Sequence, residues 1–139
     1  MIKNYTTLEE SKHLVELGVS TDTADMCYAL NDDVLAIPYN VVSKDKDFPV
    51  DGVIPCWSLS ALLELMPKSI NKYDGRVYRN YSINLFRSYY YCCGYSFGPS
   101  LNEENQDNLC IYGSEDSWLD VVYHTILWLF DEGYLKKEE

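Results

Sequence analysis

Residues 77–86 alternate between apolar and polar side chains, which is the period of a β-strand that buries one face. Residues 89–97 follow with a run of aromatic side chains, which favour strands, and residues 109–112 form a third, short candidate strand. The polar segment before them, residues 71–76, contains an Asp-Gly dipeptide that is typical of a hairpin turn. These segments predict an antiparallel meander, which needs a second layer packed on one face.

Helical segments would supply that layer. Apolar side chains recur at three- and four-residue spacing in three parts of the chain. The first, residues 7–17, begins with a capping box formed by Thr7 and Glu10. The second begins at Ser58 and ends before Pro67, which cannot continue a helix.

The third predicted helix has the widest apolar stripe, so we expect it to be the most buried. Ser114 is its predicted N-cap, two acidic residues favour its first turn, and Gly133 ends it. The predicted fold class is therefore α+β. Residues 1–139 would form a single domain, with an antiparallel sheet of about three to five strands packed with about three helices.

Residues 27–55 are not assigned to either layer. Residues 27–30 and 34–42 have the composition of strands. Proline cannot donate a hydrogen bond to a sheet, so the prolines of this segment argue against a central strand. They are Pro38, Pro49 and Pro55.

The composition predicts a hydrophobic core that is stable without disulfide cross-links, because 47% of the 139 residues are hydrophobic and 14% are aromatic. The first residues lack the apolar segment of a signal peptide, and no stretch approaches the ~20 apolar residues that span a bilayer. These features predict a cytoplasmic protein with no membrane partner. An odd number of cysteines, five, favours free and mostly buried thiols over a disulfide framework.

The net charge of −11 is concentrated at the two ends of the chain. Residues 1–47 carry −5 and residues 94–139 carry −8, whereas residues 48–93 carry +2. Phosphate binding requires clustered Lys and Arg. The overall field therefore disfavours direct binding of nucleic acid and docking onto an anionic membrane.

No residue pattern predicts a metal, a cofactor or a catalytic centre. The cysteines and histidines lack the close spacing of zinc ligands, and adjacent Cys92 and Cys93 would point to opposite faces of a strand. A Cys–His pair could be assembled only by the fold, for example from Cys56 or Cys110 with His124. Adjacent acids fall in turns or at a helix cap, where solvation or capping explains them.

The aromatic run is the strongest candidate for a binding surface. Its rings would lie on both faces of one strand, so one face could join the core while the other presents tyrosines outward. Exposed tyrosine is typical of recognition surfaces. The alternative is that a second layer, such as residues 27–55, covers that face. The candidate binding residues are Tyr89, Tyr90, Tyr91, Tyr95 and Trp57.

Four short segments form a recognisable combination. Residues 54–63 read Ile-Pro-Cys-Trp-Ser-Leu-Ser-Ala-Leu-Leu, and the helix at residues 120–128 is followed by Glu-Gly-Tyr-Leu at residues 132–135. With Thr-Ala-Asp-Met at residues 23–26, they resemble a family of small uncharacterised proteins from prophages and mobile elements of gut bacteria. The family has no established activity. The resemblance therefore implies a mobile-element accessory protein, without a mechanism or site residues.

Three classes of function remain open from the sequence. The preferred one is a non-enzymatic protein–protein interaction module that binds a partner of unknown identity through the sheet face or a Trp-lined groove. The second is an acidic decoy that mimics DNA and inhibits a host nucleic-acid enzyme, which the charge of −11 would suit. The third is a small enzyme, which would need a concave pocket and a perturbed Cys, His or carboxylate pKa. No cofactor is expected.

Overall fold

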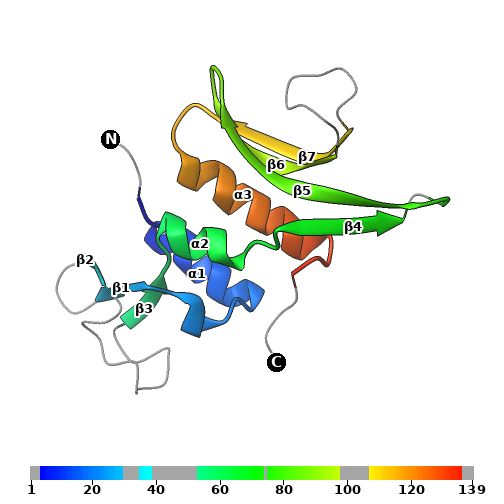
Figure 1. Ribbon diagram of the computed structural model, residues 1–139. Coiled ribbons are helices and arrows are strands. Elements are labelled where there is room, and N and C mark those ends of the chain that lie inside the picture. Colours follow the sequence, from blue (N-terminus) through cyan, green and yellow to red (C-terminus); the bar gives the residue numbers. More distant parts are fainter. Residues whose placement is uncertain (1–3, 30–34, 39–52, 74, 98–106, 136–139) are drawn as a thin grey trace.

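The computed structural model describes residues 4–29, 35–38, 53–73, 75–97 and 107–135 (Figure 1). Along these residues, two helices precede a first run of strands, α2 separates it from a second run, and α3 follows the second run. The helices are α1 (Leu8–Leu17), the 3-10 helix η1 (Thr21–Thr23), α2 (Leu59–Leu65) and α3 (Trp118–Asp131). The strands are β1 (Met26–Ala29), β2 (Leu35–Pro38), β3 (Val53–Cys56), β4 (Ser69–Tyr73), β5 (Tyr78–Arg87), β6 (Tyr91–Phe97) and β7 (Asp107–Ser114).

The strands form two antiparallel sheets. A three-stranded sheet has the order β2-β1-β3, and a four-stranded sheet has the order β4-β5-β6-β7. The α+β class and the antiparallel meander are thus confirmed. The sequence predicted one sheet and not two, because β3 pairs with β1 across a long stretch of chain that no local pattern connects.

Two of the prolines of residues 27–55 lie on strands that tolerate a residue without a backbone N–H. Pro38 belongs to β2 and Pro55 to β3, which are the outer strands of the three-stranded sheet. An outer strand tolerates a residue that cannot donate to a neighbour. Pro49 lies outside the described residues.

The β4–β5 hairpin corrects the predicted turn. Residues 71–73 continue β4, and Tyr73 pairs with Tyr78, so the chain reverses between these two tyrosines. Gly75 has φ of 101°, a left-handed conformation that glycine adopts without strain. The Asp-Gly dipeptide located the hairpin, whereas the polar side chains of residues 71–73 reflect exposure to solvent.

Two helices begin where the sequence predicts. Thr7 Oγ1 accepts a hydrogen bond from the Glu10 amide at 3.1 Å, and Glu10 Oε1 accepts from the Thr7 amide at 2.9 Å, which completes the capping box of α1. Ser58 Oγ caps α2 by accepting from the amide of Ala61 at 3.2 Å. The side chain of Ser58 also bonds the Asp25 carboxylate, which ties the start of α2 to the chain before β1.

The start of α3 differs from the prediction. Its N-cap is Ser117, whose Oγ accepts from the amide of Asp120 at 3.2 Å. The predicted cap, Ser114, is still the last residue of β7 and pairs with Tyr91 of β6. Since the sheet holds Ser114 in an extended conformation, the helix begins three residues later.

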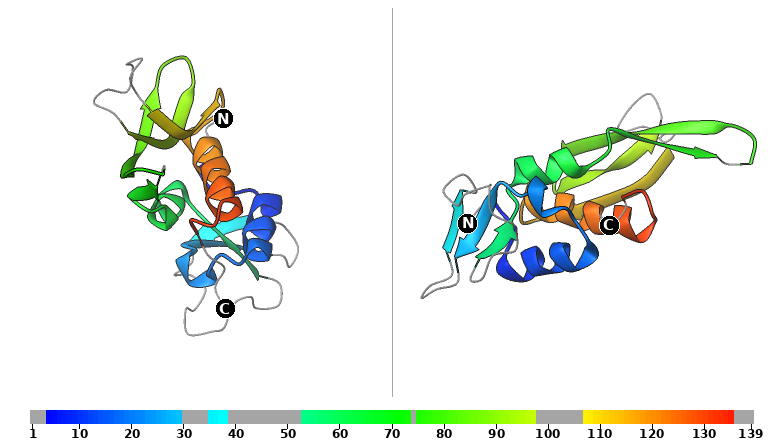
Figure 2. Two further views of the ribbon diagram at one scale, coloured as in Figure 1. Left: turned by 90° about the vertical axis from the view of Figure 1, so that its right-hand side faces the viewer. Right: turned by 90° about the horizontal axis from the view of Figure 1, so that it is seen from below.

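α3 is the central element of the packing. One side of α3 contacts β6 and β7, and α2 packs on another side. α1 packs against β3, so the two sheets lie on opposite sides of the helices (Figures 1 and 2). The prediction that α3 is the most buried helix is confirmed. Its buried residues are Leu119, Val121, Val122, Tyr123, Thr125, Ile126 and Leu129.

Candidate functional site

Two of the predicted binding residues, Trp57 and Tyr95, belong to the core. Neither has any exposed area. The Trp57 indole nitrogen donates to Thr23 Oγ1 at 2.9 Å, and the Tyr95 hydroxyl donates to the carbonyl oxygen of Pro67 at 2.5 Å. The Tyr95 ring also stacks on Trp128, with the centroids 6.3 Å apart. Trp57 and Tyr95 therefore cannot contact a partner of the folded protein, which corrects the prediction.

The other three predicted residues lie at the end of the β5–β6 hairpin. Tyr89 and Tyr90 occupy the turn and are 93% and 47% exposed. Tyr91 begins β6 and is half-buried, with its ring centroid 5.1 Å from that of Trp118 and the Arg87 guanidinium 4.4 Å above it. Two exposed tyrosines, Tyr89 and Tyr90, thus remain available to a partner at this end of the sheet.

The described strands of residues 27–55 do not cover these tyrosines. β1 and β3 belong to the three-stranded sheet, beyond α1 and α2 as seen from the four-stranded sheet (Figure 1). The inner face of the four-stranded sheet is covered by α3 instead. The alternative considered from the sequence, a covering layer formed by this segment, is therefore not supported at residues 89 and 90.

Exposed large apolar side chains are concentrated on the four-stranded sheet. Of the eight among the described residues, seven lie on β4, β5, β6 or the turns between them. The eighth, Tyr5, precedes α1, and its ring meets that of Tyr28 edge-on. The seven are Tyr73, Val77, Tyr78, Leu85, Tyr89, Tyr90 and Phe97.

The β4–β5 hairpin is also the basic part of the protein. Residues 68–87, here called the basic hairpin, carry five basic side chains and one acidic one. The rest of the chain carries six basic and 21 acidic side chains. Within the described ranges, Lys12 is the only Lys or Arg outside the basic hairpin. The end of the hairpin projects past the end of α3, away from the helices (Figures 1 and 2).

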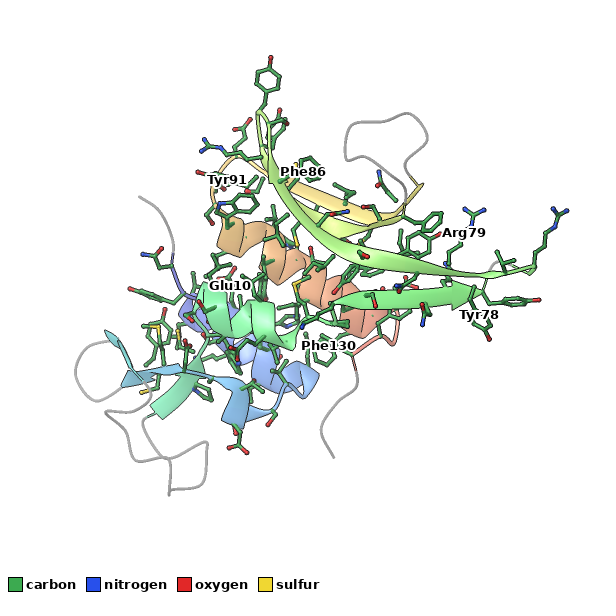
Figure 3. All side chains as sticks on the ribbon, in the orientation of Figure 1. Glu10, Tyr78, Arg79, Phe86, Tyr91 and Phe130 are labelled. Atoms are coloured by element: carbon green, nitrogen blue, oxygen red, sulfur yellow. The ribbon has the colours of Figure 1, made fainter. Side chains whose placement is uncertain are left out.

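The two faces of the basic hairpin differ. On one face the rings of Tyr73 and Tyr78 pack together, with centroids 5.0 Å apart. On the other face Lys72 lies directly opposite Arg79, whose guanidinium is 5.8 Å from the centroid of the Phe97 ring. Figure 3 shows Tyr78 and Arg79 near the far end of the hairpin. The basic hairpin thus has an aromatic face on one side and a cationic face on the other.

An open groove of about 600 Å³ lies between α1, α3 and β7, and we call it the α1–α3 groove. Its polar groups come from His13, Tyr112, His124 and Asp131. Its apolar lining comes from Leu17, Leu127, Trp128, Phe130 and Leu135. This volume lies within the range of pockets that hold drug-sized ligands, but the groove is open and its lining is polar as well as apolar.

The groove brings together residues that are far apart in the sequence. His13 and Leu17 are one turn apart on α1, and His124, Leu127 and Asp131 follow one face of α3. The sequence shows this helical spacing on each helix. It does not show that the two helices line the same groove. The Tyr112 ring lies 6.4 Å from the ring of His124, and desolvation raises the pKa of the Tyr112 hydroxyl.

Three cysteine thiols, none of which lines the groove, have a raised pKa. Burial raises the pKa of the Cys93 and Cys110 thiols to about 11, and it also raises that of Cys56, whose Sγ lies 3.4 Å from the carbonyl oxygen of Thr6. A protonated thiol is a poor nucleophile and a poor metal ligand. Over the described ranges, no three His, Cys, Asp or Glu side chains are grouped so as to hold a metal ion.

The buried thiols give a prediction on reactivity. Cys27, Cys56 and Cys93 have no exposed area, so we expect iodoacetamide to alkylate them only after unfolding. Mass spectrometry with and without urea measures this. Labelling of these three thiols in the folded protein as fast as that of free cysteine would contradict the structure.

The raised pKa values of the Cys93 and Cys110 thiols predict a loss of stability at high pH. The folded state raises the pKa of Cys93 and Cys110, so it holds protons that the unfolded chain releases near pH 9. Their contribution is fully present below about pH 9 and is lost as the pH rises toward about 11. The urea midpoint should therefore fall over this range. A Cys93→Ala, Cys110→Ala variant, compared with its own midpoint at neutral pH, should show a smaller fall.

Comparisons with protein-family models, with curated proteins and with solved structures give no match to this chain. In the part of the chain that the structure describes, no helix is both long enough and apolar enough to cross a membrane.

Proposed function

We propose that the protein is a non-enzymatic protein-binding module, and that it contacts its partner through exposed side chains of the four-stranded sheet. One observation carries the proposal: seven of the eight exposed large apolar side chains of the described residues lie on β4–β6 and their turns. Two of the seven, Tyr73 and Tyr78, form an exposed pair of rings with centroids 5.0 Å apart, and exposed tyrosine of this kind is typical of interaction surfaces.

The residue types support the same proposal. Four of the seven are tyrosines, which dominate binding hot spots because they offer a large contact area with few rotatable bonds. Tyr73 and Tyr78 already pack together, so a partner would meet a partly ordered pair of rings. Tyr89 and Tyr90 offer a second contact at the opposite end of β5. The resemblance noted above supports a role as an accessory protein of a mobile element.

The net charge of −11 supports a second candidate, the DNA-mimicking decoy. A decoy needs a continuous acidic strip with the spacing of phosphates. The basic hairpin interrupts the acidic surface with a concentration of positive charge, which favours protein binding over mimicry. Salt separates the two candidates, because a purely electrostatic complex weakens steeply at high ionic strength.

Alanine substitutions test the proposed surface. Tyr78→Ala and Tyr90→Ala should each cost more than ~1 kcal/mol of binding, about fivefold in Kd, without unfolding the protein. The measurement is a pull-down with tagged protein from host lysate, with nuclease added and washes at low and high salt, followed by titration of the captured partner.

Tyr5→Ala is the matched control, because Tyr5 is the exposed aromatic residue outside the four-stranded sheet in the part of the chain that the structure describes. It should leave the partner bound. Equal capture by all three variants would contradict the proposed surface. Capture of a nucleic-acid enzyme that is lost at high salt would favour the decoy.

A further inference from the structure

We propose that the outer face of the four-stranded sheet binds an uncharged oligosaccharide. The outer face is the one turned away from α3, which packs on the inner face (Figures 1 and 2). The inference goes beyond the proposed function, because it assigns a ligand to polar side chains that the protein-binding surface does not use. The two surfaces share the paired rings of Tyr73 and Tyr78.

The strand register decides which side chains lie on the outer face. Cys93 and Tyr95 of β6 are buried in the core on the side of α3, so the side chains that alternate with them point outward. Ser96 is one of these. Residues that pair directly across two strands share a face, so Ser82, the partner of Ser96, also lies on the outer face. Every second residue of β4 and β5 follows from there.

β4, β5 and β6 place no charged side chain on the outer face. β6 contains no charged residue at all. The charged residues of β4 and β5 are Lys72, Arg79 and Arg87. Lys72 pairs with Arg79 and Arg87 pairs with Tyr91, and these positions belong to the inner face. Since 24% of the chain is charged, an uncharged face of this size sets the sheet apart from the rest of the surface.

Three cross-strand pairs follow one another along the β4–β5 hairpin on the outer face. Hydroxyl groups form the first pair, amide groups the second and aromatic rings the third. Successive pairs lie about 7 Å apart, because two residues of a strand separate them. All six side chains are exposed. The pairs are Ser69 with Ser82, Asn71 with Asn80, and Tyr73 with Tyr78.

A row of hydroxyl and amide groups also crosses the sheet at Ser82. Ser82 pairs with Ser69 on β4 and with Ser96 on β6. Ser96 pairs in turn with Asn108 on β7. The Asn84 amide donates a hydrogen bond to the Ser96 hydroxyl, which holds both groups in place. The row and the three pairs meet at Ser82, so a ligand of several units can contact both.

The asparagines of this face work against strand formation. Asparagine is depleted in strands, whereas threonine is equally polar and fits a strand well. Solubility alone would therefore not select asparagine at four strand positions of one face. Proteins break such local rules mainly at functional sites. The four positions are Asn71, Asn80, Asn84 and Asn108.

The chemistry of the outer face matches an uncharged sugar. Amide and hydroxyl groups both donate and accept hydrogen bonds, as sugar hydroxyls do. The negative face of a tyrosine ring attracts the C–H groups on the apolar side of a sugar ring. An ionic ligand would lose hydration here and would meet no opposite charge on β4, β5 or β6. The face therefore favours a neutral oligosaccharide over a nucleic acid or an acidic peptide.

A glycan array tests the inference. Labelled protein is applied to uncharged oligosaccharides of glucose, galactose, mannose and N-acetylglucosamine, with sialylated and sulfated oligosaccharides beside them. We expect binding to one or more of the uncharged compounds, and isothermal titration with that compound gives its Kd. Tyr78→Ala and Asn80→Ala should each raise this Kd about fivefold or more. Added NaCl should leave it unchanged, because neither side is charged.

Two variants serve as matched controls. Lys72→Ala changes the same hairpin on its opposite face, and Asn4→Ala removes an exposed asparagine outside the sheet. Both should bind the oligosaccharide as the wild-type protein does. Asn80 is exposed, so Asn80→Ala should keep the urea midpoint of the wild-type protein.

The outcomes separate this inference from the proposed function. Binding to none of the uncharged compounds, binding to charged ones alone, or a Kd that rises with salt overturns the oligosaccharide as ligand. Equal weakening by Lys72→Ala and Asn80→Ala would overturn the outer face as its site. If no sugar binds and Tyr78→Ala still loses a captured protein, the protein-binding module stands alone. If Asn80→Ala loses the sugar while Tyr78→Ala and Tyr90→Ala both retain full protein capture, the oligosaccharide site stands and the proposed function fails.

Discussion

Replacing Trp57 with alanine is expected to destabilise the protein by about 3–5 kcal/mol, a large share of the ~5–15 kcal/mol of a typical domain. Trp57 has no exposed area, and its indole nitrogen donates to Thr23 Oγ1 at 2.9 Å. Its backbone amide donates to Thr6 Oγ1 at 3.1 Å, and its carbonyl oxygen accepts from the Thr6 amide at 2.9 Å. Alanine would keep these backbone bonds but leave a cavity and remove the hydrogen bond that Thr23 Oγ1 accepts from the indole, while the Thr23 hydroxyl still donates to the carbonyl oxygen of Ser20. Urea unfolding followed by circular dichroism measures the loss.

Tyr89→Ala is the control, because Tyr89 is 93% exposed. Its free energy of unfolding should change by less than about 0.5 kcal/mol. A Trp57→Ala protein of unchanged stability that had lost its partner would place Trp57 on the binding surface instead of in the core.

Replacing Gly94 with alanine is expected to cost about 3 kcal/mol or more, at the upper end of the usual effect of overpacking. A Cβ at this position would overlap the carbonyl oxygen of Cys110 and lie 2.8 Å from the Cα of Ile111. Both neighbours are backbone atoms of β7, so relief requires β6 and β7 to separate. Thermal unfolding and the yield of folded protein measure the effect.

Gly113→Ala is a matched control on the neighbouring strand. The nearest atom to a Cβ there is the Tyr90 Cβ at 3.8 Å, an ordinary contact. Its stability should change by less than about 1 kcal/mol, since alanine also restricts the unfolded chain. Equal stability of the two variants would show that β6 and β7 can separate at Gly94 without a large cost.

Features with a local cause could be predicted from the sequence. The capping box of Thr7 and Glu10 needs only four consecutive residues, and Ser58 caps α2 in the same local way. The period of residues 77–86 predicted β5 because each side chain of a strand alternates independently of the rest of the fold.

Features set by distant contacts could not be predicted. Ser114 and Ser117 are both acceptable caps, and pairing of Ser114 with Tyr91 decides between them. A tryptophan beside a helix can face either side, and only its contact with Thr23 shows that Trp57 faces inward. The second sheet depends in the same way on the pairing of β1 with β3.

The candidate surfaces also differ in whether a local sequence pattern or a distant contact creates them. The exposure of Tyr89 and Tyr90 follows from a turn beside a strand, which sequence can suggest. The basic hairpin is visible as a local excess of Lys and Arg. The groove is not visible, because its lining residues His13 and His124 come from helices that are far apart in the sequence.

Site-specific photo-crosslinking tests the proposed binding surface most directly. A photoreactive amino acid would replace Tyr78, Tyr90 or, as the control, Tyr5 in protein expressed in its native host. The account predicts covalent products with a second protein from positions 78 and 90 and none from position 5. Products from position 5 alone, or none from positions 78 and 90, would contradict the assignment of the four-stranded sheet as the binding surface.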